Sequence, residues 1–237
     1  MAYTTIRGKI LYTSKKPERM DQERGREYFT LTIQDDGVRV LHAHCEIDDA
    51  PMVVRDVVLA YDEQNLPIDC TYRLTVDHKF EGTGWFRFAK NFIESETFNQ
   101  KDGRISQKVD IDSPIQWFGS HPIVGDGLGL KVFDLTKGEG KQLFPNMAVP
   151  SPDHRGATGP MLYRLGYGLE FRGEETITVP AGTFDCYVFA FTDTAGQLPE
   201  EHPPYLVWCT KDHYVAVAAE AGGYMKTRYE LTEYVVE

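Results

Sequence analysis

The residues best suited to acid–base chemistry lie between positions 113 and 160, in a stretch rich in proline and glycine. This stretch contains Ser120-His121-Pro122, Gly125-Asp126-Gly127 and Ser151-Pro152-Asp153-His154-Arg155. A histidine changes charge near neutral pH, and a carboxylate beside it can orient its ring, so such a pair can act as a general base. The candidate catalytic groups here are therefore His121, His154, Asp126 and Asp153. Aspartate beside glycine or proline is also common in turns, so the alternative is that both aspartates only stabilise turns and that the histidines are surface residues.

Aromatic side chains of the same stretch and of nearby strands are suited to form the wall of a binding cavity. Trp117 and Phe118 precede His121, and Tyr163 and Tyr167 share one face of a predicted strand. A tyrosine hydroxyl in an apolar cavity can donate a proton or a hydrogen bond, which adds Tyr163 to the candidate catalytic residues. The candidate ligand-binding residues are Trp117, Phe118, Tyr72, Tyr167 and Trp208. The alternative is that these tyrosines belong to the core.

Metal and cofactor chemistry find less support in the sequence. His42, His44 and Glu46 alternate along one predicted strand and so share a face, but one strand supplies fewer ligands than a metal site normally needs. Cys45, Cys70, Cys186 and Cys209 are far apart in apolar runs, which predicts buried free thiols. The chain has no Walker A lysine motif, no dinucleotide-binding G-x-G-x-x-G and no G-x-S-x-G. The sequence therefore predicts neither a metal nor a cofactor.

The elements that must position these residues are β-strands, because apolar and polar residues alternate with a period of two over most of the chain. In the clearest strand, 67–77, Cys70, Tyr72 and Leu74 share one face, while Thr71 and Arg73 share the other. The predicted strands are 3–13, 27–34, 37–47, 52–62, 67–77, 83–99, 104–112, 128–134, 161–172, 175–180, 184–193, 204–210, 213–220 and 223–235. Many short strands joined by tight turns predict an all-β fold, an antiparallel meander forming an open or closed barrel. We expect one domain over 1–237, with 113–160 as lid loops that contain one short strand.

The final third of the chain carries a distinctive pattern. Val179-Pro180-Ala181-Gly182-Thr183-Phe184-Asp185-Cys186 is followed by Trp208 and Lys211-Asp212, and then by a last strand ending Leu231-Thr232-Glu233-Tyr234. Over about residues 170–235 this pattern resembles a bacterial domain family of unknown function. The members of that family are mostly envelope proteins with a half-open antiparallel β-barrel similar to those of lipoprotein carriers. The resemblance implies a concave β surface able to hold an apolar ligand, and it implies no catalytic residues.

Composition narrows the partners and the location that we expect. With 36 acidic against 25 basic residues, the net charge of -11 repels nucleic acid. No apolar run reaches signal-peptide length or the roughly 18 residues of a membrane helix, so we expect a cytoplasmic protein without membrane insertion, and leave a homodimer open.

Two functions remain. We expect a cofactor-independent acid–base enzyme, of the lyase, isomerase or hydratase type, that acts on a small apolar or aromatic molecule held in the barrel. The alternative is a non-catalytic carrier or sensor of a lipid-like ligand. An enzyme of this kind needs several converging titratable groups at the cavity, whereas a carrier needs few.

Overall fold

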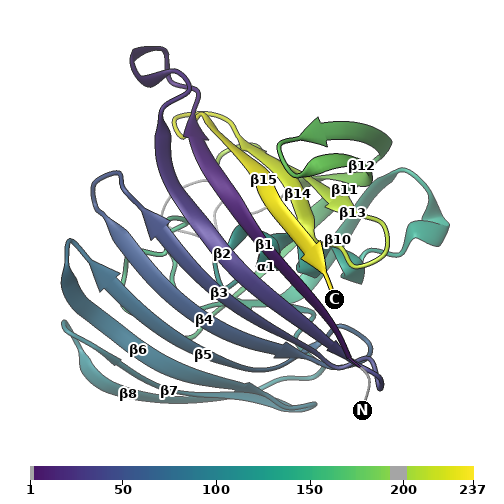
Figure 1. The fold of residues 1–237 in the computed structure, drawn as a ribbon. Helices are drawn as coiled ribbons and strands as arrows, with labels where there is room; N and C mark the ends of the chain where they lie inside the picture. Colours follow the sequence, from purple (N-terminus) through teal and green to yellow (C-terminus); the bar gives the residue numbers. More distant parts are fainter. Residues whose placement is uncertain (1–2, 193–201) are drawn as a thin grey trace.

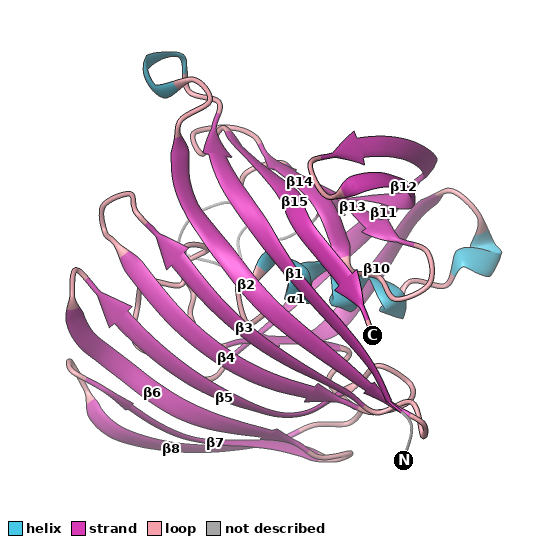
Figure 2. Ribbon diagram, in the orientation of Figure 1, coloured by secondary structure: helices cyan, strands magenta, loops and turns pink. Residues whose placement is uncertain are grey.

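The protein is built almost entirely of β-strands that belong to one strongly curved sheet (Figures 1 and 2). The computed structural model describes residues 3–192 and 202–237. The first half of the chain forms β1 (Tyr3–Ser14), β2 (Glu23–Gln34), β3 (Arg39–Ile47), β4 (Val53–Tyr61), β5 (Pro67–Val76), β6 (Lys79–Phe88), β7 (Phe92–Asn99) and β8 (Gly103–Asp110). The second half forms β9 (Trp117–Phe118), β10 (Gly140–Val149), β11 (Tyr163–Val179), β12 (Gly182–Thr192), β13 (Tyr205–Thr210), β14 (Ala216–Ala221) and β15 (Thr227–Val236).

The sheet confirms the predicted antiparallel meander. Its strand order runs from β8 through β1, continues with β15 and ends at β9, and every pair of neighbours is antiparallel except β9 with β10. The sheet is not closed, since β8 and β9 are its two end strands. Gln107 of β8 reaches Leu162 across this opening, where its amide accepts the Leu162 N–H at 2.8 Å and donates to the Leu162 carbonyl at 3.1 Å. The end strand β8 is therefore held to the residue before β11 through a side chain and not through a β-ladder.

Strict alternation of inward and outward side chains builds the wall of the barrel. In β4, Val53, Val57, Leu59 and Tyr61 are buried, whereas Val54 and Asp56 between them are exposed. Strand β5 follows the same rule with Cys70, Tyr72 and Leu74 inside, as the sequence predicts. All four cysteines are buried and free, which confirms the prediction made for them.

The segment between β8 and β11 is more regular than the predicted loops. The predicted strand 128–134 is wrong, because α1 (Ile123–Gly129) and the 3-10 turns Leu130–Val132 and Leu135–Lys137 occupy this region. Gly127 is one reason why a helix fits here. A Cβ atom at position 127 would lie 2.6 Å from the Tyr214 carbonyl oxygen, so only glycine lets the helix approach β14 this closely.

The sequence does not predict strand β10, because this strand contains Pro145. Pro145 suggests a loop, yet it lies at a register shift between Phe144 and Met147, where the ladder needs no N–H donor.

Two other predicted stretches are divided into strands differently in the structure. The run 83–99 is divided between β6 and β7, and the runs 161–172 and 175–180 form the single strand β11, which bulges near Gly173 (φ +98°). The last residue of the predicted strand 184–193 lies outside the described residues.

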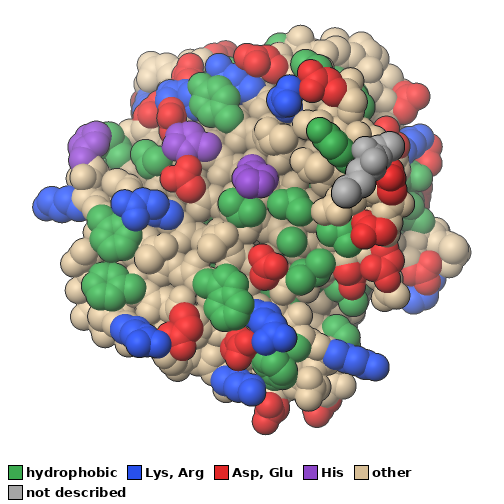
Figure 3. Space-filling view, turned by 60° about the horizontal axis from the view of Figure 1, so that its bottom comes forward, with side chains coloured by type: hydrophobic (Ala, Val, Ile, Leu, Met, Phe, Trp, Pro, Cys, Tyr) green, Lys and Arg blue, Asp and Glu red, His purple; other side chains and the backbone are tan. Residues whose placement is uncertain are grey.

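The outer surface carries charges of both signs. On the face seen in Figure 3, Lys and Arg side chains are interspersed with Asp and Glu side chains. In the described ranges 3–192 and 202–237 we find no helix with the length and apolar character needed to cross a bilayer.

Candidate functional site

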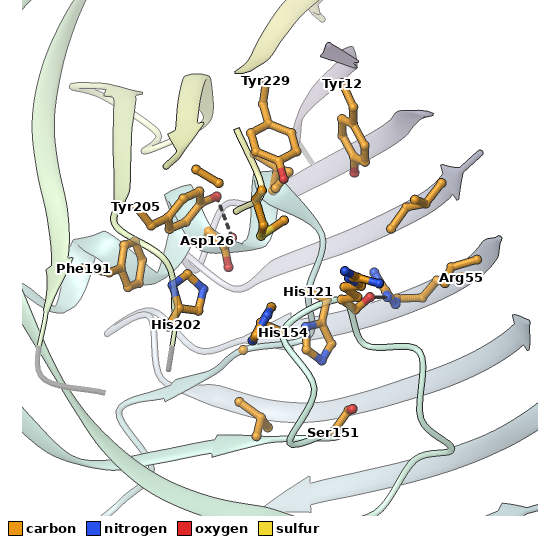
Figure 4. Close-up of a pocket in the computed structure, with 18 of the residues that line it drawn as sticks. Tyr12, Arg55, His121, Asp126, Ser151, His154, Phe191, His202, Tyr205 and Tyr229 are labelled. Atoms are coloured by element: carbon orange, nitrogen blue, oxygen red, sulfur yellow. Dashed lines mark hydrogen bonds between the residues drawn. The ribbon is translucent and has the colours of Figure 1, made fainter. Parts of the chain in front are cut away.

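A cavity of about 320 Å³ opens between the strands and the segment that follows β8 (Figure 4). Its aromatic wall comes from β9, β11, β12, β13 and β15, through Trp117, Tyr167, Phe191, Tyr205 and Tyr229. The rings of Trp117, Tyr167 and Phe191 contact one another, with centroids 5.1 to 6.2 Å apart. The volume and the aromatic wall suit a small organic molecule.

Asp126 of α1 projects into this cavity (Figure 4). The Tyr205 hydroxyl donates a hydrogen bond to its Oδ2 atom at 2.9 Å. The residue as a whole is half-buried, and it lines the cavity. This burial raises the pKa of Asp126 to about 8, against the smaller opposing effect of the Tyr205 hydrogen bond. At neutral pH the carboxyl is therefore mostly protonated.

Glu27 fixes the start of the helix that carries Asp126. This glutamate points inward from β2 and is fully buried. Its carboxylate accepts the backbone N–H of Ile123 at 2.7 Å, the N–H of Val124 at 3.0 Å and the hydroxyl of Tyr12 at 2.8 Å. Burial raises the pKa of Glu27, and these hydrogen bonds oppose the rise. One side chain of the sheet thus satisfies two backbone donors that the first turn of α1 leaves free.

Arg55 fixes the loop that carries His154. It points inward from β4, with 2% of the residue exposed. Its Nε donates to the Tyr72 hydroxyl at 2.7 Å, and its Nη2 donates to the carbonyls of Arg155 at 2.5 Å and Gly156 at 3.1 Å. Gly156 has φ +61°, and a Cβ atom there would lie 2.5 Å from Arg55 Nη2 and 2.6 Å from the His121 ring. The loop can therefore lie on Arg55 only because position 156 is glycine.

Three histidines face the cavity: His121, His154 and His202. His121 has φ +77°, and its buried Nε2 has no hydrogen-bond partner among the described residues. Burial, and then the charge of Arg55, lower the pKa of His121 well below its usual value, so the ring is neutral at pH 7. The His154 ring lies 5.6 Å from the His202 ring, measured between centroids.

Five of the sequence-predicted site residues line the cavity: His121, His154, Asp126, Trp117 and Tyr167. Asp153 does not line the cavity and caps its own loop, where its two oxygens accept the N–H groups of Arg155 and Ala157, each at 3.0 Å. Tyr163 is half-buried at the start of β11 and is not part of the cavity wall.

The other three predicted ligand-binding residues do not line the cavity either. Phe118 is fully buried against Phe86. The Tyr72 hydroxyl holds Arg55, as described above. The Trp208 Nε1 donates to Glu175 at 2.7 Å.

Sequence reasoning missed Arg55, Glu27, Tyr205 and His202. A usable signal existed for the first two, because each is a charged residue at an inward position of an otherwise apolar alternation. His202 and Tyr205 follow the undescribed residues 193–201, and nothing in their local sequence marks them.

A solved β-barrel-like structure is similar to this one in fold. The crystal structure of a β-barrel-like protein of a domain of unknown function, DUF1849, from Brucella abortus is similar to this chain with a TM-score of 0.56 and 8% sequence identity. The similarity covers 99% of this chain and 97% of the other. This likeness is one of fold, and it extends well beyond residues 170–235. No family model matches the sequence, and no curated protein matches it either.

In the part of the chain that the structure describes, no group of three or more His, Cys, Asp or Glu side chains could hold a metal ion. In the barrel-like fold the row of His42, His44 and Glu46 lies on the outer face, where His44 Nδ1 lies 2.6 Å from Asp56 and Nε2 lies 3.3 Å from Glu46.

Proposed function

We propose that the protein is a cofactor-independent acid–base enzyme that binds a small, largely aromatic or apolar molecule in the cavity. The observation that supports this most is Asp126, a carboxyl with a pKa of about 8, hydrogen-bonded to Tyr205 on an aromatic wall. A carboxyl that titrates near neutrality is suited to give and take protons at working pH, and such groups concentrate at active sites.

The roles follow from the protonation states. Protonated Asp126 donates a proton or a hydrogen bond to an oxygen of the substrate, while Tyr205 holds the carboxyl in place. His121 is neutral and its lowered pKa makes it a weak base, so its ring accepts a hydrogen bond from a substrate hydroxyl, while the ionised fraction of Asp126 takes a proton from the substrate. A proton taken at one point and given at another is the chemistry of isomerases, lyases and hydratases.

The experiment is exchange of the acidic C–H protons of phenylacetone for deuterium in D₂O, followed by proton NMR. We expect the wild-type protein to accelerate exchange and Asp126→Asn to lose about 10²- to 10⁴-fold of that acceleration, the usual contribution of an acid–base group. Asp56→Asn, on the outer face of β4, is the matched control and should behave as wild type. Equal exchange with the wild type and Asp126→Asn would contradict the role of Asp126.

A carrier of a lipid-like ligand is the second candidate, favoured by the aromatic wall and by the resemblance to lipoprotein carriers. Native mass spectrometry of the purified protein tests it. A stoichiometric bound ligand, together with no exchange above buffer, would replace the enzyme proposal by this one.

A further inference from the structure

We propose that the molecule bound in the cavity is a carboxylate, and that its anionic group is held by Arg55. This names the ligand class of the proposed function and rests on it for any catalytic use, but the binding itself is independent of turnover.

The hydrogen bonds of Arg55 leave part of its guanidinium group available. A guanidinium has five N–H donors. Nε is bound to Tyr72, and Nη2 is bound to two loop carbonyls. Nη1 has no partner among the described residues, and the residue lines the cavity. Because the other nitrogens are anchored, the Nη1 edge is fixed in direction before any ligand arrives.

The charge of Arg55 is also unbalanced. Within the described part of the chain, no acidic side chain lies within 4.0 Å of it, although the residue is 2% exposed. Arg26 and Arg228, which are more exposed, each contact at least two carboxylates. Burial of a charge without a counter-ion is costly, and an anionic ligand at Nη1 would offset that cost.

The cavity as a whole is cationic, in contrast to the chain. Its lining includes Lys16, Arg19, Arg24, Arg55 and Arg155, against the acids Asp49 and Asp126. Asp49 is already paired with Arg19 and Arg24, and Asp126 is mostly protonated at neutral pH. A protein of net charge -11 thus has a positive interior surface, which attracts anions and repels cations.

The two sides of the cavity differ in a way that orients the ligand. Arg55 and His121 lie on one side, whereas Phe191 and Tyr205 lie on the other (Figure 4). A carboxylate at Arg55 would direct an apolar body toward the aromatic side, where Asp126 is placed to act on it. Arginine suits a carboxylate because its planar donors match the spacing of two carboxylate oxygens.

The test is calorimetric titration at pH 7 with phenylacetate and with phenylacetamide, which has the same shape but no charge. We expect wild-type protein to bind the acid at least tenfold more tightly than the amide, about 1.4 kcal/mol. Octanoate and octanamide form a second arm. A preference in the first arm assigns aromatic acids, and a preference in the second assigns fatty acids. Equal affinity for acid and amide in both arms overturns the proposal.

A variant then tests whether Arg55 is the residue that holds the carboxylate. Arg55→Gln should bind the acid and the amide equally, whereas Arg104→Gln, an exposed arginine of β8, should keep the wild-type preference. A full preference for the acid in folded Arg55→Gln overturns the assignment to Arg55. If this variant does not fold, NMR of wild-type protein with labelled arginine replaces it. The Nε–H resonance of Arg55 should shift with phenylacetate and not with phenylacetamide, and the absence of that difference overturns the assignment.

Failure of this inference is distinguishable from failure of the proposed function. Equal binding of acids and amides, with isotope exchange still dependent on Asp126, removes only the ligand class. A preference for acids without any proton transfer retains the carboxylate site in a carrier.

Discussion

The wall formed by β2 to β5 and the segment 111–162 differ in regularity and in what they supply to the cavity. The wall alternates and contains buried charged side chains, among them Arg55 in the cavity lining and Glu27 behind it. The segment is a succession of short elements and contributes the titratable groups His121, Asp126 and His154.

The difference shows how an irregular segment can be placed accurately. Glu27 accepts the N–H groups that begin α1, and Arg55 donates to the carbonyls of the loop after β10. Charged groups bond to backbone dipoles more strongly than neutral groups do, and a buried partner left unsatisfied costs about 1–3 kcal/mol. We infer that the wall orders the segment, and that the segment in turn closes the cavity.

The largest expected effect concerns the cost of burying Asp126. Its carboxyl stays protonated in the folded protein up to a pH of about 8, whereas in the unfolded chain it ionises near 4. The unfolded state therefore binds fewer protons between these values, and the free energy of unfolding falls as the pH rises from 4 to 8. Asp126→Asn removes this loss and should stabilise the protein at pH 8 by on the order of 3–5 kcal/mol, with little effect at pH 4. Urea denaturation of both proteins at four pH values measures it. A difference that does not grow with pH would show that the wall does not bury this carboxyl.

A smaller effect is expected at Glu27, which accepts the backbone N–H groups that begin α1. Glu27→Gln keeps one carbonyl oxygen but leaves one of the two N–H groups of α1 unsatisfied, so we expect a loss of about 2–3 kcal/mol. Hydrogen exchange should accelerate at Ile123 and Val124 more than in β5. Uniform acceleration over the whole chain would mean that Glu27 supports the sheet generally and not the segment. Glu46→Gln, on the outer face of β3, serves as the control.

The smallest effect is expected where the loop crosses Arg55. Gly156 and Gly103 both have positive φ, +61° and +74°, but a Cβ atom at 103 would meet nothing within 4 Å. Alanine at either position incurs the backbone strain, and only at 156 does it also displace Arg55 and His121. Gly156→Ala should therefore destabilise the protein by about 1–2 kcal/mol more than Gly103→Ala. Equal thermal midpoints for the two variants would refute the close packing of this loop on Arg55.

The same contrast determines what the sequence could reveal. Alternation predicts the wall, because a strand that buries one face must repeat with a period of two, as β4 and β5 do. It fails in the segment, where Pro145 lies inside β10, and where α1 is only seven residues long and approaches β14 through Gly127. The cavity residues His121 and Asp126 stood out by residue type, whereas Asp153 has the same type and caps a turn. Local sequence does not distinguish the two, since the difference depends on Glu27 and Arg55, about one hundred positions away in the chain.

The most direct test of this account is the pKa of Asp126 itself, measured from its side-chain carboxyl ¹³C resonance in the wild-type protein. If the wall and the segment together enclose this group against Tyr205, the resonance titrates with a midpoint near 8. A midpoint near 4, the value of an aspartate in water, would contradict the account, because Asp126 would then be an ordinary surface carboxylate without the property on which the proposed chemistry depends.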